Sequence, residues 1–338
     1  SLNKNVFKSL NKLLKDVMNN KKFNTSGAYR LYNFPKLSTP IVNQLESMLG
    51  SIRSKSQPEA KIIEALLNMN GKSVLAVYNK QPKQSTIELG IIENRWDNVN
   101  HNKNKVFIFD ATAKTDPYYW VSNAPKIIDF DDNTKYPNLK LVFYSKHDIH
   151  RGAIRDNKDG ILNKIKKILD NHNDENILVV TSNECEGSVI QTLRTNNISV
   201  EHFGNLKGKN EYMKHHVILF TNVWRREDLD YTLLAKEIDS TLHLPRLWKK
   251  KRETIKKKVR AGISIPLTNS QAEFNNQSIE NVRTSLMTTD IIQDVFRTAI
   301  RSKNTADVTA YLPIENPDLI LKLIAAFPGC KPIIKHLV

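Results

Sequence analysis

The sequence predicts an α/β protein in which helices cover a parallel β-sheet, with a smaller helical region before it. From residue 139 to residue 221, short apolar runs typical of buried parallel strands alternate with segments of helical periodicity. Before residue 70, apolar side chains recur at helical spacing. The 338 residues are 40% apolar and 25% charged, which is a globular composition and enough chain for two domains.

The first 70 residues are predicted to form a small helical subdomain. Apolar residues between Val6 and Met18 recur at helical spacing, with lysines on the opposite face. Two further segments, 41–52 and about 59–69, show the same period, and Pro58 suits the first turn of the second. We expect these helices to pack against one another.

Strands are predicted after residue 73. Segments 73–78 and 85–92 look like a hairpin, and the short apolar run 105–110 ends in Asp110. The triplet Gly71-Lys72-Ser73 resembles the end of a phosphate-binding loop, but it follows a helix and precedes a strand. We interpret it as a turn.

The polar stretch 129–137 is the predicted linker between region 1–128 and region 138–338. Region 138–338 shows strand–helix–strand repetition with short connections, which favours a parallel sheet covered by helices. The predicted strands are 139–144, 177–181, 198–203, 217–221 and 307–312; the predicted helices are 159–171, 186–196 and one that begins with Asn316 as cap and Pro317 as first residue.

The charge balance points to a polyanionic partner. Lys plus Arg number 51 and Asp plus Glu 35, a net charge of +16, and nucleic acid is the simplest partner. Segment 246–260, inside a basic insertion of about 246–289, has nine Lys or Arg and one acid, a net charge of 9 − 1 = +8. Aromatic residues among cations can stack bases, although a solvated lysine-rich helix also fits. The candidates are Arg225 (after Trp224), Trp248, Lys249, Lys250, Lys251, Arg252, Lys256, Lys257, Lys258 and Arg260.

Other classes of function have weaker support. Two cysteines, Cys185 and Cys330, do not form a disulfide framework, which fits a cytoplasmic protein. The pairs His147/His150 and His215/His216 lack convincing further ligands, so no metal site is predicted. No apolar run approaches the length of a membrane span, and carboxylates are not clustered as in a nuclease.

Three segments, taken together, suggest a site that acts on a phosphate. The first is the predicted strand end Asp110-Ala-Thr112, and the second is the two-glycine loop 204–211 after a predicted strand. The third contains Gln293, Arg297 and Arg301, which at i, i+4 and i+8 would share one face of a helix. An arginine in that position could reach a phosphate supplied by another domain.

In their order, these segments resemble the C-terminal portion of a superfamily 2 helicase of the kind found in replication proteins of phages, plasmids and other mobile elements. Asp110-Ala-Thr112 resembles motif III, 177–182 motif IV and 293–301 motif VI. The loop 204–211, with the predicted strand 217–221 after it, resembles motif V. The resemblance implies a RecA-like fold: the tail of a first RecA-like domain within 1–128, and a second within 138–338. Motifs I and II are absent, so it also implies a missing N-terminal part and no ATP hydrolysis by this chain alone.

The resemblance assigns roles to individual residues. Asp110 and Thr112 would link an ATP site to domain closure, Gly208 and Asn210 would lie near the nucleotide or the strand, and Gln293 would orient phosphates or water. Arg297 and Arg301 are the candidate arginine fingers. Phe296 replaces the usual glycine, and Arg301 is eight rather than seven residues from Gln293, so either arginine could be the finger. The implied nucleic-acid contacts are Thr181, Ser182 and Lys207.

Two functions remain open at this point. The first is the C-terminal part of an ATP-dependent DNA helicase or translocase, which would bind ATP and Mg²⁺ only with the missing part. Its partners would be single-stranded or forked DNA, or RNA, together with that missing part or other replication proteins. The second is a non-catalytic nucleic-acid-binding accessory or regulator of replication.

Overall fold

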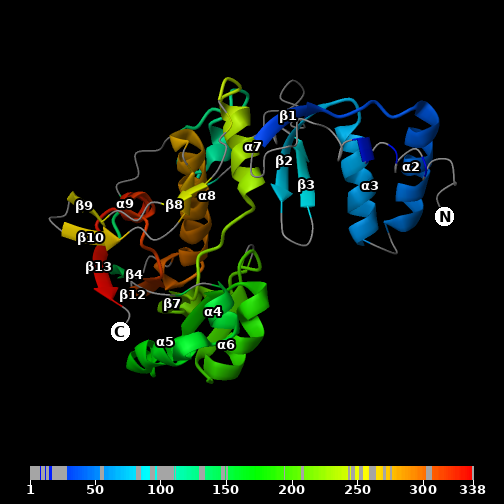
Figure 1. Cartoon of the computed structure of the whole chain (residues 1–338). Coiled ribbons are helices and arrows are strands. Elements are labelled where there is room, and N and C mark those ends of the chain that lie inside the picture. Colours follow the sequence, from blue (N-terminus) through cyan, green and yellow to red (C-terminus); the bar gives the residue numbers. More distant parts are fainter. Residues whose placement is uncertain are drawn as a thin grey trace.

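The protein is described from a computed structural model (Figure 1). The described residues are 8, 12, 15, 16, 29–53, 57–80, 85–91, 96, 110, 112–128, 134–145, 149, 151–193, 195–206, 209–242, 244, 248–250, 254–258, 264–268, 272–274, 276–301 and 307–336.

A parallel sheet forms the centre of the C-terminal region, as the sequence predicts, but it has six strands, and the sequence predicts only five of them; the edge strand β13 is the addition. Its order is β13-β4-β12-β7-β5-β6, and every neighbouring pair is parallel. The strands are β4 (Leu139–Ser145), β5 (Ile177–Thr181), β6 (Ile198–His202), β7 (Val217–Phe220), β12 (Val308–Leu312) and β13 (Lys331–His336).

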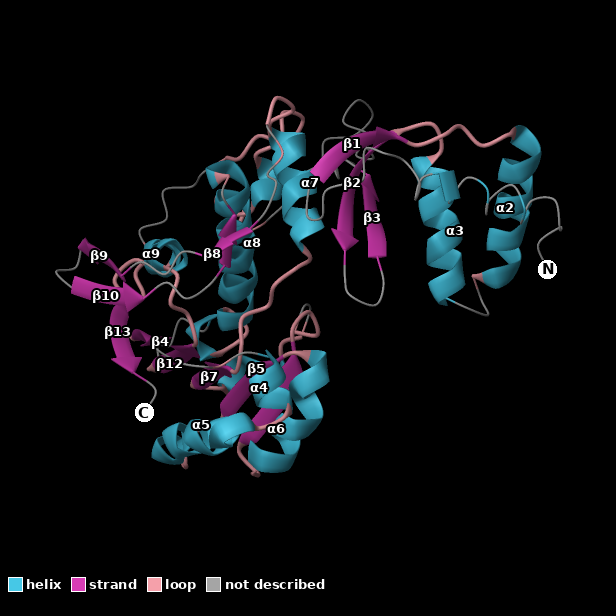
Figure 2. Cartoon of the chain, in the orientation of Figure 1, coloured by secondary structure: helices cyan, strands magenta, loops and turns pink. Residues whose placement is uncertain are grey.

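Helices cover both faces of this sheet (Figure 2). Successive residues of a strand point to opposite faces, so Leu141 and Phe143 join one core cluster while Val142 and Tyr144 join the other. The first face packs against α8 (Gln277–Val295) and α9 (Pro317–Ala326); the second packs against α4 (Arg151–Arg155), α5 (Ile161–Leu169) and α6 (Glu186–Leu193). Burial on both faces explains the unbroken apolar runs of the sequence.

The predicted start of the last helix is confirmed. The Asn316 side chain accepts a hydrogen bond from the Leu319 amide at 3.0 Å, and Pro317 is the first residue of α9. A cap of this kind satisfies an amide that the helix itself leaves unpaired.

The N-terminal region is only partly helical, which corrects the prediction for residues 1–70. Helices α2 (Thr39–Ile52) and α3 (Gln57–Met69) form as expected, but β1 (Tyr29–Asn33) is a strand. It pairs antiparallel with β2 (Ser73–Lys80), which also pairs with β3 (Ser85–Ile91). The strand forms because a partner 40 residues later supplies its ladder, a contact that local periodicity does not reveal.

The turn predicted at Gly71 is confirmed. Gly71 has φ +68° and lies between the end of α3 and the start of β2. Glycine occupies this left-handed conformation without steric cost. The predicted strand 105–110, apart from Asp110, and linker residues 129–133 lie outside the described residues.

The described residues of the basic segment 246–260 lie in strands, so a lysine-rich helix is the wrong interpretation for them. The predicted insertion of about 246–289 also includes residues 277–289, which are the first part of α8. It follows α7 (Asp228–Ile238) and contains β8 (Trp248–Lys250), β9 (Thr254–Lys258), β10 (Ser264–Thr268) and β11 (Ala272–Phe274). β9 pairs antiparallel with β10, and β8 with β11. Pairing with a partner strand overrides the helix propensity of lysine.

Helix α8 joins two apolar clusters. Its residues up to Leu286 pack with α7 and with residues 118–124, while those from Met287 onward pack on the sheet.

None of the helices in the described part of the chain is both long enough and apolar enough to cross a membrane.

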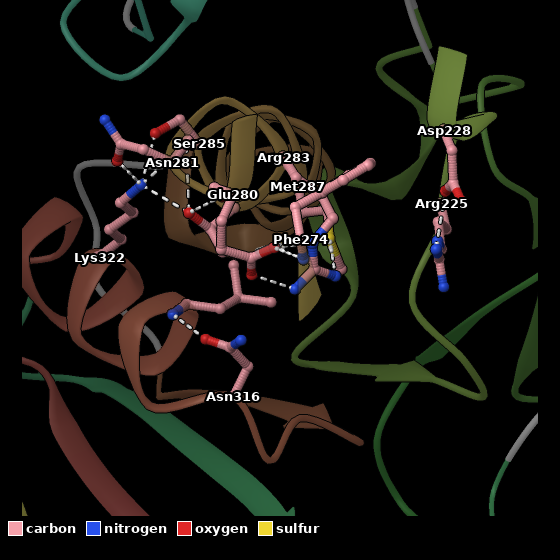
Figure 3. A network of polar contacts seen from close by, with 12 residues as sticks. Arg225, Asp228, Phe274, Glu280, Asn281, Arg283, Ser285, Met287, Asn316 and Lys322 are labelled. Carbon is pink, nitrogen blue, oxygen red and sulfur yellow. Dashed lines mark hydrogen bonds and ion pairs between the residues drawn. The ribbon is translucent and has the colours of Figure 1, made fainter. Parts of the chain in front are cut away.

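Polar side chains also hold α8 in place. Glu280 and Arg283 form a buried ion pair, with Arg283 only 2% exposed, and Glu280 also accepts from the Phe274 amide at 3.1 Å. On the other side, Lys322 of α9 donates to Asn281 and Ser285 at 2.7 and 2.6 Å (Figure 3). Burial lowers the pKa of Lys322 to about 8. These contacts fix α8 against β11 and α9.

We predict that Arg283→Met destabilises the fold by about 3–5 kcal/mol, because it leaves the Glu280 carboxylate buried and uncompensated. Urea unfolding measures the effect. Arg53→Met removes the exposed α2–α3 pair with Glu64 and should cost under about 1 kcal/mol. The double variant E280Q/R283M should recover much of the loss; equal losses in the single and double variants would contradict this account.

Candidate functional site

The carboxyl ends of β5 and β7 lie at the point where the strand order reverses: β5 is followed by β6 on one side of the sheet, and β7 by β12 on the other. The chain leaves β5 toward α6 on one face, whereas β7 continues into the segment that returns through α8 on the other. Neighbouring strands whose connections diverge leave a crevice between them, where open α/β sheets bind ligands. Thr221 and Thr181, both fully buried, meet there with their hydroxyl oxygens 2.7 Å apart.

Three of the four buried side-chain atoms that lack a hydrogen bond among the described residues lie at this edge; the fourth, His215 Nδ1, lies before β7. Among the described residues, Ser182 Oγ and Arg226 Nε are buried and have no hydrogen-bond partner. His202 Nδ1 also lacks one, although it lies 3.3 Å from a Glu186 oxygen. These residues follow or end β5, β7 and β6. A buried donor left unpaired costs about 1–3 kcal/mol, so a ligand that accepts hydrogen bonds would fit here.

The loop after β6 is held by Glu201. Its carboxylate accepts from Asn205 at 2.5 Å, from Lys209 at 2.6 Å and from the Tyr212 hydroxyl. Burial alone would raise the pKa of Glu201, but these hydrogen bonds outweigh it and hold the pKa below its ordinary value. The network positions the described part of the predicted loop. Lys207 and Gly208 lie outside the described residues.

Arg301 contacts this loop. Its Nη1 donates to Asn210 Oδ1 at 3.0 Å. The neighbouring Ala299 amide donates to the carbonyl of His215, which precedes β7. Arg301 and Asn210 therefore lie toward the amino edge of the sheet, away from Thr181 and Thr221.

Gln293, Arg297 and Arg301 do not share a helix, which corrects the predicted common face. α8 ends at Val295, and Arg301 belongs to the short 3-10 helix η7 (Ala299–Arg301). The chain leaves the helix because Thr298 Oγ1 bonds to the Val295 carbonyl at 2.7 Å and Phe296 packs against Tyr136 and Phe327. Arg297 is half-buried and Arg301 exposed.

The structure does bring together two of the predicted segments. Gln293 Nε2 lies 3.3 Å from Thr112 Oγ1, and the Thr112 hydroxyl donates to Asp110 Oδ1 at 2.7 Å. The Tyr119 hydroxyl donates to the other Asp110 oxygen at 3.0 Å. One turn earlier on α8, Thr289 lies 3.5 Å from the Thr115 hydroxyl. Asp110, Thr112 and Gln293 therefore form one chain of contacts.

A second contact links α8 to the segment after β7. Arg226 Nη2 lies 3.2 Å from an Asp290 oxygen, and both side chains are largely buried. Its guanidinium also lies over Trp224, 5.1 Å from the ring centroid. Burial opposes the charge, but the nearby Asp290 carboxylate keeps the pKa of Arg226 raised. Arg225 instead pairs with Asp228 at 2.7 Å.

The basic segment is described only in part. Trp248, Lys249 and Lys250 lie in β8, and Lys256, Lys257 and Lys258 lie in β9. The β9–β10 register sets Lys256 opposite Pro266. Lys251, Arg252 and Arg260 lie outside the described residues.

Several residues of this region were not singled out from the sequence. Asp290 meets Arg226 across 64 positions, and no local pattern signals that pair. Glu201 and Tyr212 flank the predicted glycine loop at its two ends. A carboxylate before the loop and a phenol after it are the features of the sequence that could have indicated this hydrogen bond. Searches with protein-family models and against curated proteins gave no match to this chain.

We predict that Glu201 makes stability depend on acid pH. Because its pKa is lowered on folding, its contribution is present above the ordinary pKa of a glutamate and is lost as pH falls through the lowered value. Thermal unfolding between pH 3 and 7 should show a shallower acid decline in Glu201→Gln. Asp307→Asn, at a carboxylate whose side chain is 67% exposed, should retain the wild-type slope. An unchanged slope in Glu201→Gln would contradict the prediction.

Proposed function

We propose that this chain is the C-terminal part of an ATP-dependent DNA helicase or translocase that acts in replication of a mobile element. The observation that carries the proposal is the contact between Gln293 and Thr112, which lie 181 residues apart. The helicase resemblance assigns these two residues to motifs VI and III. In a motor that closes two domains around a nucleotide, motifs III and VI must touch, because the movement of one domain reaches the other through them.

The sheet supports the same proposal. A parallel sheet with helices on both faces is compatible with a RecA-like fold. The carboxyl ends of β5 and β7 adjoin two buried donors without partners among the described residues, Ser182 Oγ and Arg226 Nε. Phosphate oxygens of a nucleic-acid backbone are suitable acceptors for such donors. The net charge of +16 would favour the approach of a polyanion.

The residues that the structure describes do not by themselves fit Mg²⁺. Both carboxylate oxygens of Asp110 are engaged, by Thr112 and by Tyr119. Within the described part of the chain, no group of three His, Cys, Asp or Glu side chains could hold a metal ion. We propose that the phosphates of ATP are held mainly by a domain that supplies motifs I and II.

The proposed mechanism assigns positioning roles to this chain. Nucleic acid would bind at the carboxyl ends of β5 and β7, beside Arg226. Asp290 connects Arg226 to α8, and Gln293, on the same helix, contacts Thr112. A shift of α8 would therefore move Thr112 and Asp110 together. ATP would supply the free energy that biases this shift, and Arg297 or Arg301 would donate hydrogen bonds to its phosphates.

One observation favours the second function, a non-catalytic nucleic-acid-binding accessory protein. Arg301 already donates to Asn210 and lies toward the amino edge of the sheet, whereas Gln293 contacts Thr112. An arginine held in this way would have to leave Asn210 before it could act as a finger. Under this alternative, nucleic-acid binding stays and ATP hydrolysis is absent from the complete protein.

We predict that neutralising the basic strand weakens nucleic-acid binding and flattens its salt dependence. The variant is Lys256→Gln, Lys257→Gln and Lys258→Gln, assayed by fluorescence anisotropy on single-stranded and duplex DNA from 50 to 300 mM salt. Each lost phosphate contact should reduce the logarithmic salt slope by about 0.7–0.9.

A control with the same change in charge is available on α5. Lys164, Lys166 and Lys167 are exposed and lie on the face of the sheet opposite α8. Their substitution by glutamine should change the salt slope less than the β9 substitution. Equal effects would show that only net charge matters, and absence of salt-sensitive binding by the wild-type chain would contradict the proposed function.

We also predict that Arg297→Ala or Arg301→Ala abolishes ATP hydrolysis in the protein that includes motifs I and II. The loss of a finger costs about 10³–10⁵ in turnover, while DNA affinity should stay within about twofold. Arg53→Ala, at an exposed arginine of the α2–α3 pair, is the control. Unchanged turnover in both variants would refute the finger assignment, and no turnover in the parent protein would favour the accessory function.

A further inference from the structure

A row of aromatic rings leads from the core to the surface at the carboxyl ends of β6 and β7. Phe220, the last residue of β7, is 3% exposed and lies parallel to Phe203, with ring centroids 6.3 Å apart and planes 18° apart. Phe203 follows β6 and lies parallel to Trp224, at 6.5 Å and 12°. Phe203 and Trp224 are both half-buried. The buried Phe220 anchors two rings that solvent reaches in part.

The spacing of these rings leaves part of each face uncovered by the next ring. Parallel rings in van der Waals contact have planes about 3.5 Å apart. The centroid separation of 6.5 Å between Phe203 and Trp224 is larger than that spacing. The two nearly parallel rings are therefore not piled directly on one another in contact.

Hydrogen-bond donors border this stack. Arg226 holds its guanidinium over Trp224 and keeps a buried Nε that has no hydrogen-bond partner among the described residues. Arg225 is the next residue after Trp224, and its side chain is 42% exposed. Aromatic faces beside cationic donors are the combination with which proteins bind unpaired bases and their phosphates.

We propose that Phe203 and Trp224 form a stacking platform for an unpaired base of single-stranded nucleic acid. The proposal rests on the proposed function, because it assumes that nucleic acid binds at this edge. It adds the part of the nucleic acid that these rings contact. In a duplex the faces of each base are covered by its neighbours, so only an unpaired base presents a free face to Trp224. The neighbouring Arg226 donates to the phosphate of the same nucleotide.

A different result is expected if the ring stack serves only to hold Arg226 in place. In that case, loss of the Trp224 ring would weaken the phosphate contacts of Arg226, and both the salt slope and the binding to base-free strands would change. A base platform instead contributes a part of the binding free energy that does not depend on salt and that is present only when the strand carries a base.

The test compares the full chain with Trp224→Leu on two fluorescent 12-residue strands, oligothymidine and a base-free abasic strand with the same phosphates. Trp224→Phe keeps an aromatic face, and Trp120→Leu, at another half-buried tryptophan, is the matched control. Thermal unfolding of each variant confirms that it folds.

We expect Trp224→Leu to weaken oligothymidine binding at least about fivefold at every salt concentration, with an unchanged salt slope and little effect on the abasic strand. Trp224→Phe should retain most of the affinity, and Trp120→Leu should bind as the parent does. Unchanged oligothymidine affinity in Trp224→Leu, or an equal loss on both strands, would overturn the platform while the proposed function stands. Absence of binding to either strand by the parent chain would overturn both.

Discussion

The anchoring of α8 is the constraint on which the rest of the arrangement depends. Its first half packs with α7 and residues 118–124, and its second half packs on the central sheet. The buried pair of Glu280 and Arg283 and the contacts of Lys322 fix it at β11 and α9. Because the helix is fixed at these points, its side chains reach the segments around it at defined positions.

Two side chains on one stretch of α8 connect the candidate sites. Asp290 meets Arg226, in the segment that follows β7, and Gln293 meets Thr112. These residues are three positions apart, so they lie close together on the helix surface. An event at the carboxyl edge of the sheet and one near Asp110 would therefore act on the same turn of α8. The proposed coupling between nucleic acid and nucleotide rests on this proximity.

The sequence predicted the central sheet well, because buried parallel strands produce apolar runs that are separated by helical periodicity. It failed at β1, where pairing with the distant strand β2 decides the structure, and at β9, which pairs with the neighbouring strand β10. It also failed at Arg297 and Arg301, where packing of Phe296 and the Thr298 side chain ends the helix early. The contact of Gln293 with Thr112 was not predicted from the sequence, because the two residues lie 181 positions apart. The pair of Arg226 and Asp290 had no local signal.

Hydrogen–deuterium exchange of the full chain, with and without saturating single-stranded DNA, tests the central claim most directly. The account predicts slower exchange in the residues that follow β5 and β7, together with a change in the second half of α8 near Asp290 and Gln293. Protection confined to the α5 face, or protection after β5 and β7 without any change in α8, would contradict it.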